Sequence, residues 1–428
     1  MSRFKILNII FVKFILLQLF ISCSSNQSIP LRALKGIPSN TDELLDFNAV
    51  IFHQHIDSSK VFVSFRNDDL LYKRSEISSK LTAELRIQYN LFEGMDERKM
   101  IDSSSIFISD LAESEYPTSK KILSQFQLAT ALGKTYQIHI HLIDLNKKIK
   151  HTYKGSINKE NKFSKQNYLV LDNDSVVFKN QLTATKRVKL IYPNGSKKFY
   201  VKLFTKEFGP ALPPFSTTAN SNQDFDPDSS FIIEGQNTSF TLSMPYKGFY
   251  YIEADGANSA GITLLSTTEN YPTVASSEEM INSTRYIMNK SEFEACKTSN
   301  ERKQAIDNFW LGIGGSNERA RQLIKTYYSR VADANKNFTT YKEGWKTDRG
   351  MIYIVFGPPK NYFIGKSEEI WFYGSDSDPS SLRFVFKKEK IGFIENSYEL
   401  ERSVFFKEAY YQAVDFWRQG NLYLNEGR

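Results

Sequence analysis

Five histidines are the side chains best suited to bind a metal ion, and four of them form two His-x-His pairs. The pairs are His53 with His55 and His139 with His141, while His151 stands alone. On a β-strand this spacing places both imidazoles of a pair on one face, as some metal sites require. His139 and His141, however, alternate with apolar residues, so we expect them on the polar, exposed face of a strand. The sequence therefore predicts no metal and no other cofactor.

Other patterns with known chemistry do not fit this chain. Asp224, Asp226 and Asp228 have the spacing of a calcium loop, but Ser229 and Gly235 stand where an EF-hand needs Gly and Glu. We interpret them as a solvated acidic loop. No phosphate loop, no Gly-x-Gly-x-x-Gly opening a helix and no Gly-x-Ser-x-Gly element occurs. We therefore expect no enzymatic activity.

Two cysteines, Cys23 and Cys296, are too few for a disulfide scaffold. Residues 1–22 have a basic start and a short apolar core, Phe14–Ile21, which is too short to span a bilayer. Small and polar residues follow. This segment resembles a bacterial lipoprotein signal, cleaved before Cys23 with lipidation of its thiol, such as by palmitate. The alternative is an ordinary signal peptide with an incidental cysteine. We expect Cys296 to be an inert thiol.

A lipid on Cys23 would hold the protein to a membrane, because each buried methylene contributes roughly 0.8 kcal/mol. Residues 23–44 then form a tether. The resemblance to other lipoproteins favours the outer membrane, since no Asp follows Cys23, and leaves both leaflets open. Loss of the three basic residues of the signal would lower the formal charge from +7 to +4. Such a diffuse excess does not predict nucleic-acid binding.

One long motif spans residues 344–359, with an apolar stretch in its middle. It resembles the signature of the GWxTD-domain family, whose members are mainly secreted or lipid-anchored proteins of Bacteroidota and related bacteria. The resemblance implies a location for the protein, secreted or lipid-anchored, and does not imply a catalytic activity. The matching residues are Gly344, Trp345, Thr347, Asp348, Arg349, Gly350, Gly357, Pro358 and Pro359.

The motif's side chains allow a structural interpretation and two functional ones. In the structural one, Gly344 and Gly350 bracket a tight turn using backbone angles that other residues avoid, and Trp345 anchors it in a core. Thr347 and Asp348 would bind local backbone amides, and Arg349 would pair with Asp348 or Glu343. In the functional ones, Trp345, Asp348 and Arg349 bind a glycan or a peptide, or Asp348 serves a hydrolase.

Apolar patterns predict a multidomain chain with two antiparallel β-sandwich-like domains at residues 45–160 and 161–268. Strict alternation, as in Leu85–Leu91, indicates half-buried strands. In the second domain, Asn194-Gly195 between two apolar runs predicts a β-hairpin. Residues 208–230, rich in Pro, Ser, Asn and Asp, are expected to form a long exposed loop that could contact a partner.

Residues 269–428 are expected to form an α+β domain, the GWxTD domain. Apolar stripes before and after Gly314-Gly315 predict a helical hairpin, and Ser276 fits a helix start. We predict a strand at Met351–Phe356, ended by Pro358 and Pro359. A last helix should stop near Gly420.

These observations favour a lipid-anchored, non-enzymatic scaffold of the bacterial outer membrane. We expect it to be an accessory subunit of a complex for protein assembly or export, contacting other outer-membrane proteins. Aromatic residues reach 14%, and large aromatic side chains are enriched at interfaces. The alternatives are a stand-alone lipoprotein that binds glycans or peptides, for which Trp345, Trp371 and Tyr373 would need exposed rings, and a cryptic hydrolase.

Overall fold

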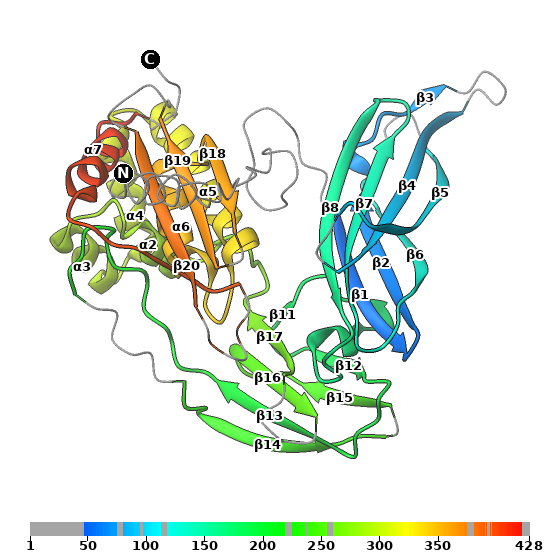
Figure 1. Cartoon of the computed structure of the whole chain (residues 1–428). Helices are drawn as coiled ribbons and strands as arrows, with labels where there is room; N and C mark the ends of the chain where they lie inside the picture. Colours follow the sequence, from blue (N-terminus) through cyan, green and yellow to red (C-terminus); the bar gives the residue numbers. More distant parts are fainter. Residues whose placement is uncertain are drawn as a thin grey trace, which may run out of the picture. The chain divides into compact units, whose positions relative to one another are not determined.

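The structure is a computed structural model that describes residues 47–421, apart from 75–79, 95–96, 113–117, 219–224, 237, 255–259, 366, 375–380, 390, 392–393 and 395. The predicted signal peptide, Cys23 and the tether lie outside the described residues, as does Asp224. Within the described ranges the protein is mostly β-strand, with several antiparallel sheets and helices near the C-terminus (Figure 1). No helix in those ranges combines the length and apolar character needed to cross a bilayer.

The first β-region consists of two antiparallel sheets that share one core. Sheet 1 has the order β1-β2-β6, and sheet 2 has the order β3-β4-β7-β8 with β5 paired to β4. Alternate residues such as Val61 and Val63 in sheet 1, and Leu85 and Ile87 in sheet 2, meet in that core, as the period of two requires. The strands are β1 (Asn48–His55), β2 (Ser58–Arg66), β3 (Lys73–Arg74), β4 (Leu81–Glu93), β5 (Met100–Leu111), β6 (Lys121–Ala129), β7 (Thr135–Asp144) and β8 (Ile149–Asn158).

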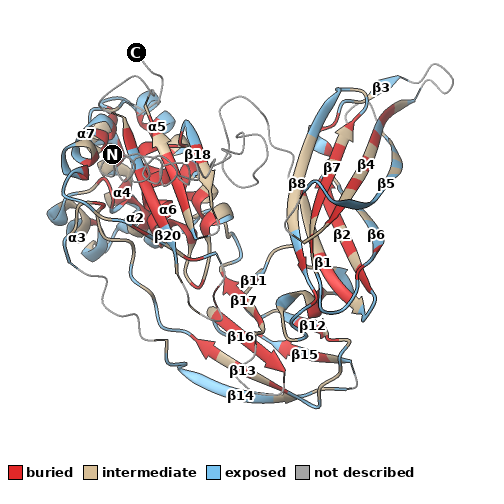
Figure 2. Cartoon of the chain, viewed as in Figure 1, coloured by how far each residue is buried: buried red, intermediate tan, exposed pale blue. Residues whose placement is uncertain are grey.

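The second β-region also has two sheets around one core, which is seen as buried residues in Figure 2. Sheet 3 has the order β10-β9-β12-β15, and sheet 4 the order β11-β17-β16-β13-β14; only the β11–β17 pair is parallel. The strands are β9 (Leu169–Asp172), β10 (Ser175–Val176), β11 (Gln181–Thr183), β12 (Arg187–Ile191), β13 (Lys198–Phe204), β14 (Ser229–Glu234), β15 (Ser239–Ser243), β16 (Gly248–Ala254) and β17 (Ile262–Thr267).

The predicted hairpin at Asn194-Gly195 is wrong. A turn does form, with Gly195 at φ +69° and its N–H donating to the Tyr192 carbonyl at 3.2 Å. The strands on either side, however, belong to different sheets: β12 pairs with β9 and β15, while β13 pairs with β14 and β16. The turn therefore carries the chain from one layer to the other, where both runs bury alternate residues in the same core.

The C-terminal region packs helices against the antiparallel sheet 5, whose order is β18-β19-β20-β21. The predicted helical hairpin is present: Gly315, at φ +66°, ends α4 and the Ser316 side chain caps α5. Ser276 caps α2 in a capping box with Glu279. The elements are α2 (Ser277–Thr284), α3 (Lys290–Thr298), α4 (Arg302–Gly314), α5 (Asn317–Phe338), α6 (Asp348–Phe356), β18 (Asn361–Ile364), β19 (Glu368–Tyr373), β20 (Leu382–Lys388), β21 (Tyr398–Leu400) and α7 (Phe406–Arg418).

Residues Met351–Phe356 are helical, so the predicted strand is wrong. They form most of α6, and every residue of this helix is buried. A short apolar run that is buried on all sides has no periodicity to separate a strand from a helix. The β-branched residues Ile352, Ile354 and Val355 favoured the strand, and tertiary packing overrides that local preference.

Residues 208–230 were expected to form a long exposed loop. The expected exposure is wrong for the first part of this segment. Residues 205–218, which follow β13, pack on the C-terminal region. Ala211 donates its N–H to the Lys346 carbonyl at 2.9 Å, and the Ser403 N–H donates to the Pro214 carbonyl at 3.0 Å. Phe215 packs against Tyr410, with ring centroids 5.7 Å apart. We call residues 205–218 the strap.

Candidate functional site

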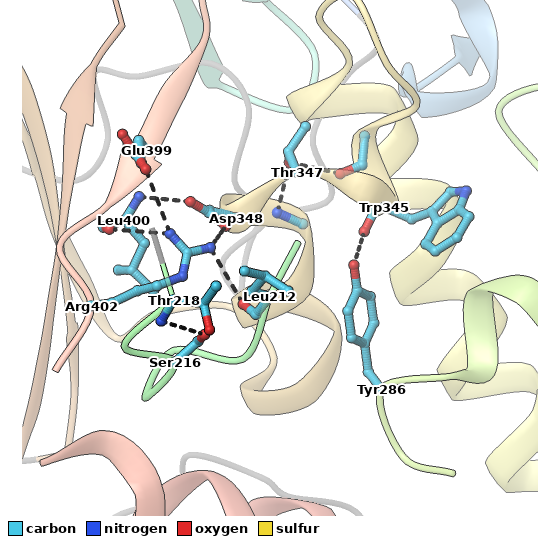
Figure 3. A network of polar contacts seen from close by, with 12 residues as sticks. Leu212, Ser216, Thr218, Tyr286, Trp345, Thr347, Asp348, Glu399, Leu400 and Arg402 are labelled. Atoms are coloured by element: carbon cyan, nitrogen blue, oxygen red, sulfur yellow. Dashed lines mark hydrogen bonds and ion pairs between the residues drawn. The ribbon is translucent and has the colours of Figure 1, made fainter. Parts of the chain in front are cut away.

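The motif is a helix start and not a turn between strands. Gly344–Lys346 form one turn of 3-10 helix, and Thr347 is the N-cap of α6. The Thr347 hydroxyl accepts the Gly350 N–H at 3.0 Å and donates to the Gly344 carbonyl at 2.7 Å (Figure 3). A hydroxyl at this position satisfies one of the backbone donors that every helix leaves open at its first turn. The expected local bonding of Thr347 is therefore present.

Gly344 and Gly350 are required by close packing and not by unusual backbone angles. Neither has a positive φ. A Cβ on Gly344 would lie 2.0 Å from the Ala334 carbonyl oxygen of α5, and one on Gly350 would lie 1.9 Å from the Gly344 carbonyl oxygen. The two glycines thus allow α5, the 3-10 turn and α6 to touch through their backbones. The expectation that they supply special φ angles is wrong.

The end of the motif closes α6. Gly357 follows the helix at φ +83°, where a residue with a side chain would be strained, and its N–H donates to the Tyr353 carbonyl at 2.8 Å. The Gly357 carbonyl accepts the Tyr373 hydroxyl at 2.8 Å. Pro358 and Pro359 then prevent the helix from continuing. These prolines were expected to end a strand, and instead they follow a helix.

Asp348 binds two partners that lie more than fifty residues further along the chain. Its Oδ2 accepts the Leu400 N–H at 2.8 Å, and its Oδ1 forms an ion pair with Arg402 Nη2 at 2.5 Å (Figure 3). The same guanidinium nitrogen lies 3.4 Å from the Leu212 carbonyl oxygen of the strap. The carboxylate thus joins α6, β21 and the strap. It was expected to bond local amides, and that expectation is wrong.

Arg349 pairs with neither of its expected partners, Asp348 and Glu343. Its Nη1 binds Glu369 Oε2 at 2.9 Å in a buried ion pair, and its Nη2 donates to the Asn396 carbonyl at 2.6 Å. The guanidinium carbon also lies 4.3 Å from the centre of the Tyr398 ring. The other oxygen of Glu369 accepts the Trp371 indole N–H at 2.7 Å. Arg349 therefore fixes sheet 5 against α6.

The three aromatic rings proposed for glycan binding are buried. Trp345, Trp371 and Tyr373 are 5%, 0% and 2% exposed. The indole N–H of Trp345 donates to Glu343 at 2.9 Å. The backbone carbonyl of Trp345 accepts the Tyr286 hydroxyl at 2.9 Å (Figure 3). No glycan can stack on rings in these positions. The motif as described is a packed structural unit in which each charged group already has an internal partner.

The two His-x-His pairs belong to different sheets, and the expected exposure of His139 is wrong. His139 is buried, lies 5.0 Å from the Phe92 ring centre and has its Nε2 3.2 Å from Glu97. Burial lowers the pKa of His139 and brings that of His141 and His53 to about 4. His53 belongs to sheet 1 and the other two to sheet 2. Among the described residues, no three His, Cys, Asp or Glu side chains form a group that could hold a metal.

Two further candidates have ordinary roles. Asp228 accepts the backbone N–H groups of Lys206 and Thr205 at 2.9 and 2.7 Å, and these bonds lower its pKa. Asp228 therefore binds the beginning of the strap. Cys296 is a buried free thiol on α3, and burial raises its pKa, so little of the reactive thiolate forms.

One known domain family matches the C-terminal part of the chain. The family model of the GWxTD domain matches residues 248–419. This GWxTD-domain match confirms the resemblance read from the motif, and it begins at the first residue of β16. No curated protein matches the sequence.

Two solved structures show partial likeness. One, with 13% identity and a TM-score of 0.19, is described as a glycosyl hydrolase family 2 member from Bacteroides cellulosilyticus; the match covers 28% of this chain and 16% of that one. The other is red sea bream transglutaminase, with 9% identity, a TM-score of 0.19, and coverage of 53% and 31%. The chain thus spans less than a third of either protein, and at these TM-scores neither likeness bears on its function.

Proposed function

We propose that this protein is a non-enzymatic scaffold, held to the bacterial outer membrane by a lipid on Cys23. It would act as an accessory subunit of a complex that assembles or exports outer-membrane proteins, in a bacterium of the Bacteroidota type. In this proposal residues 45–160 and 161–268 are two sandwich-like modules that present surfaces to partners. Residues 269–428 are a third module, built around the motif.

The internal pairing of the motif's charged residues carries this proposal. A catalytic carboxylate needs an oxygen free to exchange a proton or attack a substrate. Both oxygens of Asp348 are bound, by Leu400 and Arg402, and both oxygens of Glu369 are bound, by Arg349 and Trp371. The cryptic hydrolase thus lacks an available acid or base at the motif, which favours a structural role.

The edge of sheet 2 offers a surface of the kind that a scaffold uses. β5 is twelve residues long, contains neither Lys nor Pro, and pairs with β4; the described residues supply no second neighbour. Long open edges that lack such protective residues readily accept another strand. Four of its apolar side chains are exposed, with Phe107 at 69%: Met100, Ile101, Phe107 and Leu111. We propose that a partner strand adds to β5.

Affinity purification from crosslinked cells tests the scaffold role. A tagged full-length protein is expected to recover outer-membrane proteins, and the double change Ser105→Lys with Phe107→Ser should reduce that recovery several-fold by charging the β5 edge. Leu311→Ser is the matched control, because Leu311 is also an exposed apolar residue but lies on α4. Recovery of the tagged protein alone would reject the scaffold role, and equal recovery by both variants would reject the β5 edge.

A separate experiment tests the anchor. Cells labelled with a palmitate analogue are expected to transfer the label to the wild-type protein and not to Cys23→Ser. The variant should move from the membrane pellet to the soluble fraction, because its acyl chains are lost. Continued sedimentation of unlabelled Cys23→Ser with membranes would contradict the lipid anchor without affecting the partner experiment.

A further inference from the structure

A cavity of about 270 Å³ lies beside the motif, on the face of the C-terminal region that the strap covers. Its walls come from α2, α3, the first residue of α4, and strap residues 207–210, and Trp345 forms part of its lining. The hydrogen bond from the Ala211 N–H to the Lys346 carbonyl holds the strap at this place. Three separate parts of the sequence, 207–210, 278–302 and 345–346, therefore line one small cavity.

Basic side chains outnumber acidic ones in the lining of this cavity. Arg302 pairs with Glu278 at 3.4 Å, and Lys346 pairs with Glu343 at 2.9 Å. Glu207 is the other acidic residue in the lining. The remaining two cations are Arg285 and Lys297, and the described part of the chain offers neither of them a carboxylate in an ion pair.

Both of these cations lie beside the same aromatic ring. The guanidinium carbon of Arg285 lies 5.1 Å from the centre of the Phe293 ring, and the ammonium of Lys297 lies 5.9 Å from the same centre. A ring face attracts a cation but does not neutralise it. An anion beside either cation would supply the countercharge that the ring does not.

Apolar and aromatic side chains also line the cavity. Phe208 of the strap, Ile281 of α2, Phe293 and Trp345 contribute to the lining. Small-molecule sites combine such apolar walls with a few convergent polar groups, and typically enclose roughly 300–1,000 Å³. The volume here is slightly below that range and suits a ligand with a single ring or a short chain.

We propose that this cavity binds a small organic anion, with its carboxylate or phosphate beside Arg285 and Lys297 and its apolar part against Phe293. The site is independent of the scaffold role, because it uses neither the β5 edge nor the lipid anchor. Its occupant is defined by two features: a negative charge and an adjoining ring or apolar chain.

Calorimetric titration of the full soluble chain tests both features. Phenyl phosphate and benzoate serve as probes, inorganic phosphate tests the charge alone, and benzyl alcohol tests the ring alone. We expect binding of at least one aromatic anion, more tightly than inorganic phosphate, with no binding of benzyl alcohol. Affinity should fall as salt is raised, because the charges that bind the anion are partly exposed. The stronger of the two aromatic probes identifies the acidic group.

Paired variants locate the binding. The double change Arg285→Gln with Lys297→Gln should weaken binding of the aromatic anion at least tenfold. Arg321→Gln with Lys325→Gln makes the same charge change on exposed residues of α5, outside the cavity, and should leave affinity unchanged. Phe293→Leu should weaken phenyl phosphate and leave inorganic phosphate unaffected. No binding of either aromatic anion, or equal binding by the two double variants, would overturn the proposal.

Discussion

The carboxylate of Asp348 and the guanidinium of Arg402 form an ion pair of 2.5 Å between side chains that are only 7% and 10% exposed. The pair connects the first residue of α6 to the segment that follows β21. Because Arg402 also reaches the Leu212 carbonyl, the same contact extends to the strap. The Asp of the motif is therefore a junction between three segments and not a surface acid.

Asp348→Asn should strongly destabilise the C-terminal region. The change leaves the buried Arg402 charge with only the longer contact to Glu399, at 3.9 Å, and loss of one member of a buried pair costs about 3–5 kcal/mol. All four tryptophans lie between residues 310 and 417, so tryptophan fluorescence during urea unfolding follows this region alone. Asp307→Asn is the control, because Asp307 pairs with Lys303 on the exposed surface of α4 and should lose less than about 1 kcal/mol. Equal losses in the two variants would contradict the junction.

Gly344→Ala and Gly350→Ala should each prevent stable folding of the C-terminal region. The added methyl group would stand about 2 Å from a backbone oxygen, which no side-chain movement can relieve. Gly312→Ala is the matched control. Gly312 lies in α4 with open space around its Cβ position and no positive φ, so alanine there should stabilise by about 1 kcal/mol. Soluble yield and the fluorescence midpoint measure both effects, and normal midpoints for either motif variant would reject the close-packing explanation.

Thr347→Val should lower the free energy of unfolding by about 1–2 kcal/mol, because it removes the oxygen that caps α6 while keeping the shape of the side chain. Thr347→Ser retains the hydroxyl and should lose less. The comparison separates the cap from the packing of the methyl group, since the Thr347 side chain is nearly buried. A serine variant as unstable as the valine variant would indicate that packing, and not the hydrogen bonds, makes this residue necessary.

Several elements were readable from the sequence because their signals are local. Ser276 caps a helix at the expected place, and Gly315 ends α4 with the positive φ that glycine tolerates best. The last helix, α7, ends at Arg418, close to the expected stop near Gly420. The alternation of apolar and polar residues in β4 and β7 likewise indicates that one face of each strand is buried. In each case, a few neighbouring residues determine the local structure.

Long-range relationships were not readable. Arg349 binds Glu369, which lies 20 residues away, and Asp348 binds Arg402, which lies 54 residues away. No local pattern marks either partner. The Asn194-Gly195 turn was located, but whether its flanking strands pair depends on two other sheets. The apolar run of α6 was wrongly predicted to be a strand, because complete burial removes the periodicity that separates strands from helices.

His53 should make the first β-region less stable as the pH falls. Burial, opposed by a bond to the Asn158 carbonyl, lowers its pKa from 6.5 to about 4, and the nearby Lys159 charge adds to the lowering. Between these two values the unfolded chain binds a proton that the folded chain excludes. The stabilising contribution of neutral His53 is therefore complete above about pH 6.5 and is lost as the pH falls towards 4.

Hydrogen exchange of β1 and β2 amides measures this effect. These strands contain no tryptophan, so tryptophan fluorescence does not report their unfolding. After correction for intrinsic exchange rates, the wild type should lose protection between pH 7 and pH 5. His53→Gln cannot titrate, and its amide N–H can still donate to the Asn158 carbonyl, so its protection should change less. His55→Gln, on the exposed end of β1, should behave like the wild type. A pH response in His53→Gln as steep as that of the wild type would assign the effect to another group, since His139 and His141 on β7 also have lowered pKa values.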